Sequence, residues 1–384
     1  MRKLWPSGLP PPRILMYERE PRVTPEGRDG YSISLAGYDE TGGLFAARDM
    51  GILDQVLQRA TPGLDGDFKL TLWDSTWKEL LVQKYKPVDG LPTAGIRIAR
   101  RELRNLLIEV AGTNDVTWGA SCVGAKKLAN GKIMVDVVNH SNSKERSQVE
   151  CDLLVVADGA SSKIRDMVRP EDPLQYTGIM MKGGLAVFPD GLPKPVDKNW
   201  GILLSKGQGV ACFFSPYNEK SMAWGVSYRS ESIEAPVNYS NPRDVQSVLD
   251  DCLELGKDFA EPFGSIIKAT KPQEVSRLPA KDKQPFRHNI SVTGPILFIG
   301  DSNHAVSPYA GYGASLAMKD GWDLSSKICE ALELGDAVAA YDTVSVPRAT
   351  KVIKESHSRI GMGHATGLSY YLAKTKITIG SYFV

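Results

Sequence analysis

The chain has 384 residues, 46 basic against 45 acidic side chains, and a formal net charge of +1. With 42% hydrophobic and 24% charged residues, the composition excludes a disordered or low-complexity protein and predicts a globular one. The even charge balance, without any basic cluster, argues against nucleic acid as a partner. No apolar run is long enough to span a membrane and no secretory signal opens the sequence, so we expect a cytoplasmic protein.

The first part of the chain alternates between short apolar runs and helical patterns, which predicts an α/β fold. Strands are expected over residues 13–19, 31–35, 68–73, 77–85, 116–121, 133–139 and 151–157. Helices are expected over residues 41–60 and 98–110. The five cysteines are far apart and form no CxxC pair, so we interpret them as buried thiols and predict no metal site.

The texture changes over residues 178–292, where short strand-like segments are separated by Gly, Pro, Asn and Lys. One helix is expected within this stretch, over residues 244–259. We interpret the whole stretch as an inserted, mostly antiparallel sheet. A buried strand over 295–301 and a long helix over 313–333 follow it. The remaining chain has a helical pattern to about residue 359 and is expected to be irregular beyond it.

The first motif that carries chemistry spans residues 151–165, where an apolar strand ends in Asp158 and Gly159. In open α/β sheets, ligands bind at the carboxyl ends of the strands. Asp158 can hold a hydroxyl group there, and Gly159 permits a tight turn. Ser162 is predicted to cap the next helix, and Arg165 to pair with Asp158 or with a phosphate. The structural alternative is a plain strand-turn-helix with a serine cap.

The second motif spans residues 299–315 and again ends an apolar strand, this time in a Gly-Asp pair. After a proline-containing loop, Gly311 and Gly313 begin a long helix whose N-terminal N–H groups can face an anionic ligand. Asp301 is expected to accept hydrogen bonds from sugar-like hydroxyls. His304 is a candidate base, but we favour a structural, hydrogen-bonded histidine.

These two motifs, in this order and about 140 residues apart, resemble those of class A FAD-dependent monooxygenases, the para-hydroxybenzoate hydroxylase-like superfamily. The similarity extends over most of the chain and is greatest to fungal secondary-metabolite and tetracycline-inactivating members. It implies an α/β fold with a Rossmann-like FAD-binding domain, an inserted antiparallel substrate domain and C-terminal helices. The expected divisions are 13–177 and 293–360 for the FAD-binding domain, 178–292 for the substrate domain and 361–384 for a C-terminal tail.

The resemblance also implies the positions that bind FAD. The acidic residue that ends the second strand of such proteins binds the adenosine ribose, and an arginine that opens the helix near residue 100 contacts the flavin. The expected FAD-binding residues are Glu18, Arg19, Gly30, Arg100, Asp158, Asp301, Pro308, Gly311, Gly313 and Ala314. Candidate substrate-lining residues are Phe213, Phe214, Trp224 and Tyr228. No pattern identifies a catalytic acid or base, and the family's chemistry demands no fixed triad.

One part of the family pattern has no counterpart. The strand, Gly-x-Gly-x-x-Gly turn and helix that bind the FAD pyrophosphate are not found, so we expect the first strand-turn-helix of the domain to be lacking. The two strands that would flank it are expected to have unpaired edges.

The activity that the resemblance implies is the transfer of one oxygen atom from O2 to a small organic substrate, aromatic or polyketide-like, with NADPH or NADH reducing FAD. Two alternatives stay open: a truncated or inactive relative unable to bind FAD, and a flavin-dependent epoxidase of the same fold. A halogenase is disfavoured because the chain has no Trp-x-Trp-x-Ile-Pro run.

Overall fold

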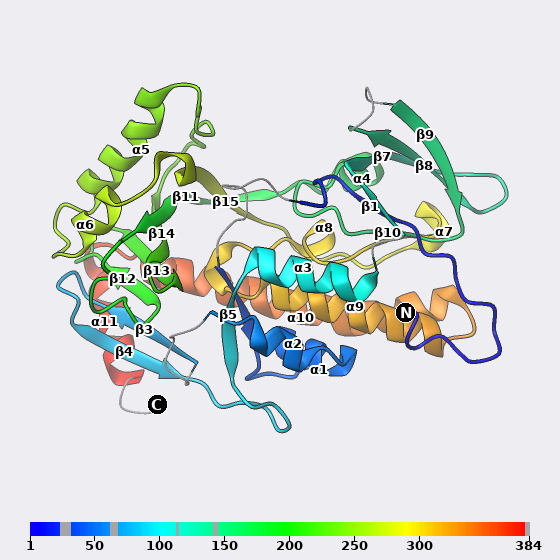
Figure 1. The fold of residues 1–384 in the computed structure, drawn as a ribbon, viewed down its shortest axis with the longest axis horizontal. Helices are drawn as coiled ribbons and strands as arrows, with labels where there is room; N and C mark the ends of the chain where they lie inside the picture. The colour runs from blue at the N-terminus through cyan, green and yellow to red at the C-terminus, as the bar shows by residue number, and fades with distance from the viewer. Residues whose placement is uncertain (24–31, 62–67, 113–114, 141–144, 381–384) are drawn as a thin grey trace.

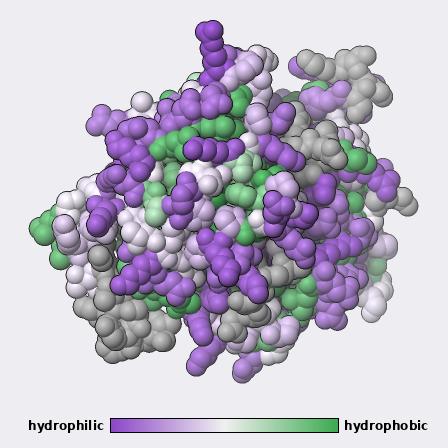
Figure 2. All heavy atoms as spheres, turned by 60° about the vertical axis from the view of Figure 1, so that its left-hand side comes forward, coloured by the Kyte–Doolittle hydropathy of each residue, from purple (hydrophilic) through white to green (hydrophobic). Residues whose placement is uncertain are grey.

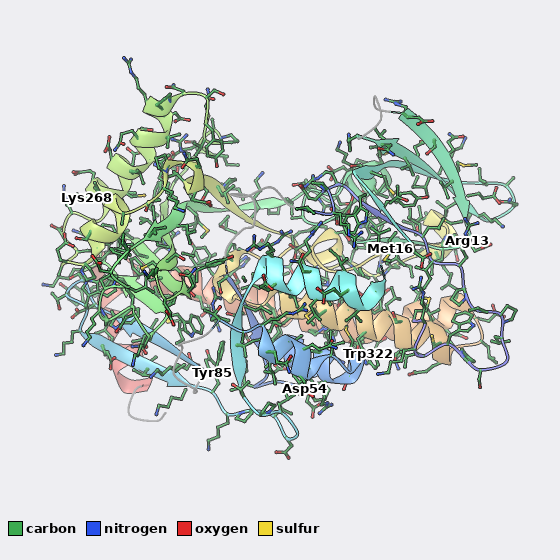
Figure 3. The ribbon with its side chains drawn as sticks, viewed as in Figure 1. Arg13, Met16, Asp54, Tyr85, Lys268 and Trp322 are labelled. Atoms are coloured by element: carbon green, nitrogen blue, oxygen red, sulfur yellow. The ribbon has the colours of Figure 1, made fainter. Side chains whose placement is uncertain are left out.

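The computed structural model describes residues 1–23, 32–61, 68–112, 115–140 and 145–380. A large sheet lies at one end of the long axis, a three-stranded sheet lies at the other, and long helices run between them (Figure 1). Lys268, the last residue of α6, lies at the end of the large sheet, and Met16 lies on the side of the three-stranded sheet (Figure 3). The face drawn in Figure 2 is mostly hydrophilic, with scattered apolar groups. Within the described ranges, no helix is both long and apolar enough to cross a bilayer.

The large sheet has seven strands in the order β15-β11-β14-β13-β12-β3-β4, and all neighbours are antiparallel except β12 and β3. Its strands are β3 (Lys69–Trp73), β4 (Glu79–Lys84), β11 (Gln175–Val187), β12 (Gly201–Leu204), β13 (Val210–Asn218), β14 (Ser221–Arg229) and β15 (Ser276–Asp282). Helices α5 (Pro242–Leu255) and α6 (Phe263–Lys268) cover one face of it and share its core.

This sheet confirms the predicted antiparallel character of the middle of the chain. It also includes the β3–β4 hairpin, which the sequence analysis placed with the FAD-binding part. The reason is a long-range parallel pairing in which Thr71 lies opposite Gly201. A pairing of this kind leaves no trace in the local pattern of either strand.

Two small parallel sheets carry the strands that precede the motifs. Strand β1 (Met16–Glu18) pairs with β6 (Val116–Trp118), and β10 (Leu154–Val156) pairs with β16 (Ile296–Phe298). Among the described residues neither pair has a further strand beside it, so each has the kind of unpaired edge that the sequence predicted. The antiparallel sheet of β7 (Ala120–Lys127), β8 (Ile133–Asn139) and β9 (Glu145–Cys151) packs in the same core as β10 and β16.

The predicted helix over 41–60 is two helices, α1 (Gly43–Met50) and α2 (Leu53–Gln58), because Gly51 takes a left-handed φ of 74° and ends the first. The helix predicted from residue 98 begins two residues later, as α3 (Arg100–Ala111). The residues before it form β5 (Gly95–Ala99), which pairs antiparallel with β2 (Ser32–Ala36). Ile96 and Ile98 face the core shared with α1 to α3, and the residue between them faces the other way.

Two long helices complete the middle of the molecule. Helix α9 (Gly313–Glu330) packs against α1, against β2 and against α10 (Leu334–Gly363). The prediction of an irregular tail beyond residue 359 is wrong, because α11 (Gly367–Gly380) is helical and packs on β4. The sequence of this segment has no amphipathic period, so its pattern did not predict a helix. The short elements are α4 (Lys163–Val168), η1 (Pro272–Glu274), α7 (Ile290–Thr293), α8 (Asp301–His304) and η2 (Pro308–Ala310).

Candidate functional site

The Asp-Gly and Gly-Asp turns lie at the same edge of one small sheet, because the strands that precede them, β10 and β16, are parallel neighbours. Ser302 Oγ donates a hydrogen bond to the carbonyl oxygen of Val156 at 2.7 Å. Arg165 Nη1 donates to the carbonyl oxygen of Ser302 at 3.2 Å. Side chains from both motifs therefore join two turns that lie far apart in the chain.

Arg165 is buried, and its described contacts do not include Asp158, one of the two partners predicted for it; a phosphate, the other, stays a prediction. Its Nη2 donates to the carbonyl oxygen of Ala160 at 2.7 Å and lies 3.3 Å from the carboxylate of Asp166. The side chain turns back over its own loop because α4 begins immediately after Ser162. Ser162 Oγ accepts the backbone N–H of Arg165 at 3.0 Å, which confirms the predicted cap.

Asp301 faces the first turn of α9. Its Oδ1 lies 3.9 Å from the point where a side-chain carbon would stand on Gly313. The carboxylate has no hydrogen-bond partner among the described residues, and burial raises the pKa of Asp301 above its ordinary value. Gly311 has a left-handed φ of 63°, and the α9 N-terminus that follows has no side-chain cap. Its backbone N–H groups and partial positive charge are therefore available to a ligand.

A buried network supports this turn from below. His304 Nε2 lies 2.6 Å from Asp320 Oδ2, which also accepts the backbone N–H of Gly300 at 2.8 Å. Arg348 donates to Asp320 at 2.8 Å and to Asp323 at 2.6 Å. Burial alone would raise the pKa of Asp320, but the His304 hydrogen bond and the Arg348 charge outweigh it and hold that pKa well below its usual range. His304 is fully buried within this network, in agreement with the structural role favoured from the sequence.

The other predicted FAD-binding positions lie on separate elements. Glu18 ends β1 and accepts the backbone N–H of Glu20 at 2.8 Å. Arg19 is largely exposed, and Arg100 is exposed at the start of α3. Pro308 is exposed and opens η2, and Ala314 is in the first turn of α9, whereas Gly30 lies outside the described residues.

The four aromatic candidates divide between the two faces of the large sheet. Phe214 and Trp224 are buried in the core beneath α5 and α6, and Tyr228 packs at the edge of that core. Phe213, one residue away from Phe214, faces the opposite side and is half-buried. Phe213 alone of the four therefore lies on the face opposite to α5 and α6, where the C-terminal end of α10 packs through His364 and Ser227.

A series of aromatic rings connects the start of α9 to the face of the large sheet that carries Phe213. Successive ring centroids are 6.1 Å apart for Tyr312 and Tyr38, 6.4 Å for Tyr38 and Phe68, 5.2 Å for Phe68 and Trp200, and 6.3 Å for Trp200 and Phe213. A further ring, labelled in Figure 3, follows β4 and stacks on Tyr38; it belongs to Tyr85. Sequence reasoning missed this series, because its members come from loops and strands without any common period.

Comparison with known proteins agrees with this geometry. The chain is 38% identical over 371 residues to the monooxygenase cfoF of Aspergillus candidus, covering 96% of this chain and 88% of that protein. Its fold is similar to that of Klebsiella pneumoniae HpxO complexed with FAD and uric acid, with a TM-score of 0.75, 18% identity and coverage of 94% and 86% of the two chains. The tetracycline destructase Tet(55) gives a TM-score of 0.67 at 17% identity, with coverage of 96% and 88%.

The fold and the paired acidic turns, together with these relatives, define an FAD-dependent monooxygenase, an oxidoreductase. Residues 48–356 match the FAD binding domain family, and the chain belongs to that family.

The residues present fit FAD in the part of the site that the structure describes. The unpartnered carboxylate of Asp301 suits hydroxyl groups, and the uncapped α9 N-terminus suits a group that carries negative charge. At Gly159 and Gly311 a side-chain carbon would meet no atom within 4 Å, so a ligand can approach the backbone closely.

Proposed function

We propose that this FAD-dependent monooxygenase uses NADPH or NADH and O2 to hydroxylate an aromatic or polyketide-like small molecule in secondary metabolism. The observation that carries the substrate class is the series of aromatic rings from Tyr312 to Phe213. The series extends from Tyr312, beside the proposed flavin position, to Phe213 on the large sheet. Planar unsaturated molecules stack well against such rings.

Two names among the relatives support this class of substrate. The relative with 38% identity is a fungal monooxygenase, and one structural neighbour is a tetracycline destructase. Fold similarity alone does not identify a substrate, so the substrate class remains our proposal.

FAD, when bound, supplies the redox chemistry of oxygen transfer. We propose that Asp301, Gly311, Gly313 and Ala314 hold its flavin end, with Asp158 and Glu18 beside its sugar hydroxyls. The protein's own contribution is then to position the cofactor and the substrate and to exclude water from them. The hydrogen bonds of Ser302 and Arg165 fix the two turns relative to each other, and the aromatic rings keep water from the reacting ring.

The test begins with an FAD titration of the purified chain, followed by NADPH and NADH oxidation assays with a panel of planar phenols and aromatic polyketides. We expect a yellow protein whose NAD(P)H oxidation is stimulated by at least one member of the panel. The product should gain one oxygen atom by mass spectrometry, and NMR should distinguish a hydroxyl group from an epoxide.

Two outcomes would contradict the proposal. A stably folded chain that takes up no FAD would indicate the inactive relative considered above. A yellow protein that yields an epoxide in place of a hydroxylated product would show the alternative chemistry on the same fold.

A further inference from the structure

One buried cation lies outside the two motifs and has no counter-ion among the described residues. Arg97, the central residue of β5, is only 5% exposed. Its side chain points away from the core that takes Ile96 and Ile98, and it reaches Ser215 of β13, on the face of the large sheet opposite to α5 and α6. It therefore lies where β5 meets β13, between the part of the chain that carries the flavin motifs and the seven-stranded sheet.

All the hydrogen-bond partners of this guanidinium are neutral. Its Nε donates to Ser215 Oγ at 3.1 Å, its Nη1 to Ser34 Oγ at 2.7 Å, and its Nη2 to the carbonyl oxygen of Ser32 at 2.5 Å. No carboxylate contacts Arg97 in the part of the chain that the structure describes. Three bonds leave two of its five N–H groups without a described acceptor.

A buried charge without a counter-ion is costly. Burial lowers the pKa of Arg97 to about 9, which records how poorly the surroundings compensate the charge. On the neighbouring strand, Ser32 Oγ is buried and makes no hydrogen bond to any described residue. An anionic oxygen placed beside the guanidinium would satisfy it.

The surroundings also define the shape of such a ligand. The guanidinium carbon lies 5.4 Å from the ring centroids of both Trp200 and Phe213, two members of the aromatic series. Next to Phe213 across the sheet is Gly225, where a side-chain carbon would meet only the carbonyl oxygen of Lys182, at 3.9 Å. The sheet face is thus free of side chains beside an aromatic ring and a cation.

We propose that Arg97 binds an anionic oxygen of the substrate, a phenolate, enolate or carboxylate on a planar unsaturated ring, and so orients that ring along the aromatic series. This inference rests on the proposed function and narrows it to anionic substrates. Ser215 and Ser34 hold the guanidinium in place, and Arg97 determines specificity without taking part in proton transfer.

The test is a binding measurement that needs no turnover. Isothermal titration of the full chain loaded with FAD compares 2-naphthoate with 2-naphthamide, two planar probes of similar size of which only the first is charged at neutral pH. We expect the wild type to prefer naphthoate by about tenfold or more, as charge-assisted hydrogen bonds do. Arg97→Gln should remove this preference, and Arg97→Lys should retain part of it.

The matched control is Arg146→Gln, which removes the same charge from an exposed position on β9 and should leave the preference unchanged. If Arg97→Gln does not fold, Ser215→Ala serves in its place and should weaken naphthoate binding severalfold while sparing naphthamide.

Three results would overturn the assignment. One is a wild type that binds the two probes equally, and another is a wild type that binds neither. The third is an Arg97→Gln variant that keeps the naphthoate preference and loses affinity for FAD, which would assign Arg97 to the cofactor. Because FAD uptake is measured separately, failure of the proposed function is distinguished from failure of this inference.

Discussion

Two of the buried arginines, Arg348 and Arg97, lie in opposite electrostatic surroundings. Arg348 contacts the carboxylates of Asp320 and Asp323, whereas Arg97 contacts only two serine hydroxyls and a carbonyl oxygen. Burial lowers the pKa of both, but around Arg348 the carboxylates outweigh it and raise the pKa above its ordinary value. The charge of Arg348 is neutralised by carboxylates within the fold, whereas for Arg97 we propose an anionic ligand.

The difference separates two uses of a buried charge. The network of Arg348, Asp320 and His304 connects α10 and α9 to the Gly-Asp turn, and its charges are paired within the fold, although His304 Nδ1 and Arg348 Nε have no hydrogen-bond partner among the described residues. Each nitrogen of the Arg97 guanidinium donates a hydrogen bond, but no described carboxylate balances its charge. Three measurements can break or sharpen this contrast.

The largest effect is expected for Asp320→Asn. This change leaves Arg348 without its fully buried partner and weakens the bonds from His304 and Gly300. Breaking a buried ion pair on one side typically costs about 3–5 kcal/mol, so we expect the free energy of unfolding to fall by about that amount in chemical denaturation. The control is Asp323→Asn, which removes a carboxylate that is 13% exposed and should cost less. Equal losses in the two variants would contradict the central place given to Asp320.

The second effect is a pH dependence of the same pair. The pKa of Asp320 is depressed in the folded protein, whereas in the unfolded chain the carboxyl titrates near about 3.9. As the pH falls the unfolded chain takes up the proton first, so the stabilisation is present above about pH 5 and is lost progressively below it. The gap in unfolding free energy between wild type and Asp320→Asn should therefore narrow by about 1 kcal/mol on acidification to about pH 3, and further at lower pH. A gap that stays constant with pH would show that another group is responsible.

The smallest effect on stability is expected for Arg97→Met. Removing an uncompensated buried charge relieves its desolvation, and this relief offsets the three lost hydrogen bonds. We expect the unfolding free energy to change by less than about 1 kcal/mol, while the preference for naphthoate over naphthamide disappears. A loss as large as that of Asp320→Asn would place Arg97 among the structural charges.

Much of the cofactor region could be predicted from the sequence, because each motif is contiguous. The strand, the acidic turn and the helix cap at Ser162 all lie within fifteen residues, and local chemistry determines them. The ends of the elements were harder to predict. Gly51 divides one expected helix into two, and residues 98 and 99, expected to begin a helix, still belong to strand β5.

The surroundings of Arg97, where we propose that the substrate binds, could not be predicted in the same way. Arg97 meets Ser34 and Ser215 at separations of 63 and 118 residues, and no local pattern records such contacts. Likewise, the neighbours Phe213 and Phe214 are indistinguishable in sequence. Because side chains alternate along a strand, Phe214 lies in the core and Phe213 lies on the opposite face of the sheet.

The parallel pairing of β10 with β16 has a consequence for how the chain is made. Leu154 of β10 pairs with Ile296 of β16, which the ribosome adds 142 residues later. At about 5–20 residues per second this delay is roughly 10 to 30 seconds, during which β10 has no partner and the seven-stranded sheet is still emerging. Biosynthesis must therefore complete the inserted sheet before the two acidic turns can meet, and a nascent chain arrested within that interval should bind chaperones through the uncovered β10.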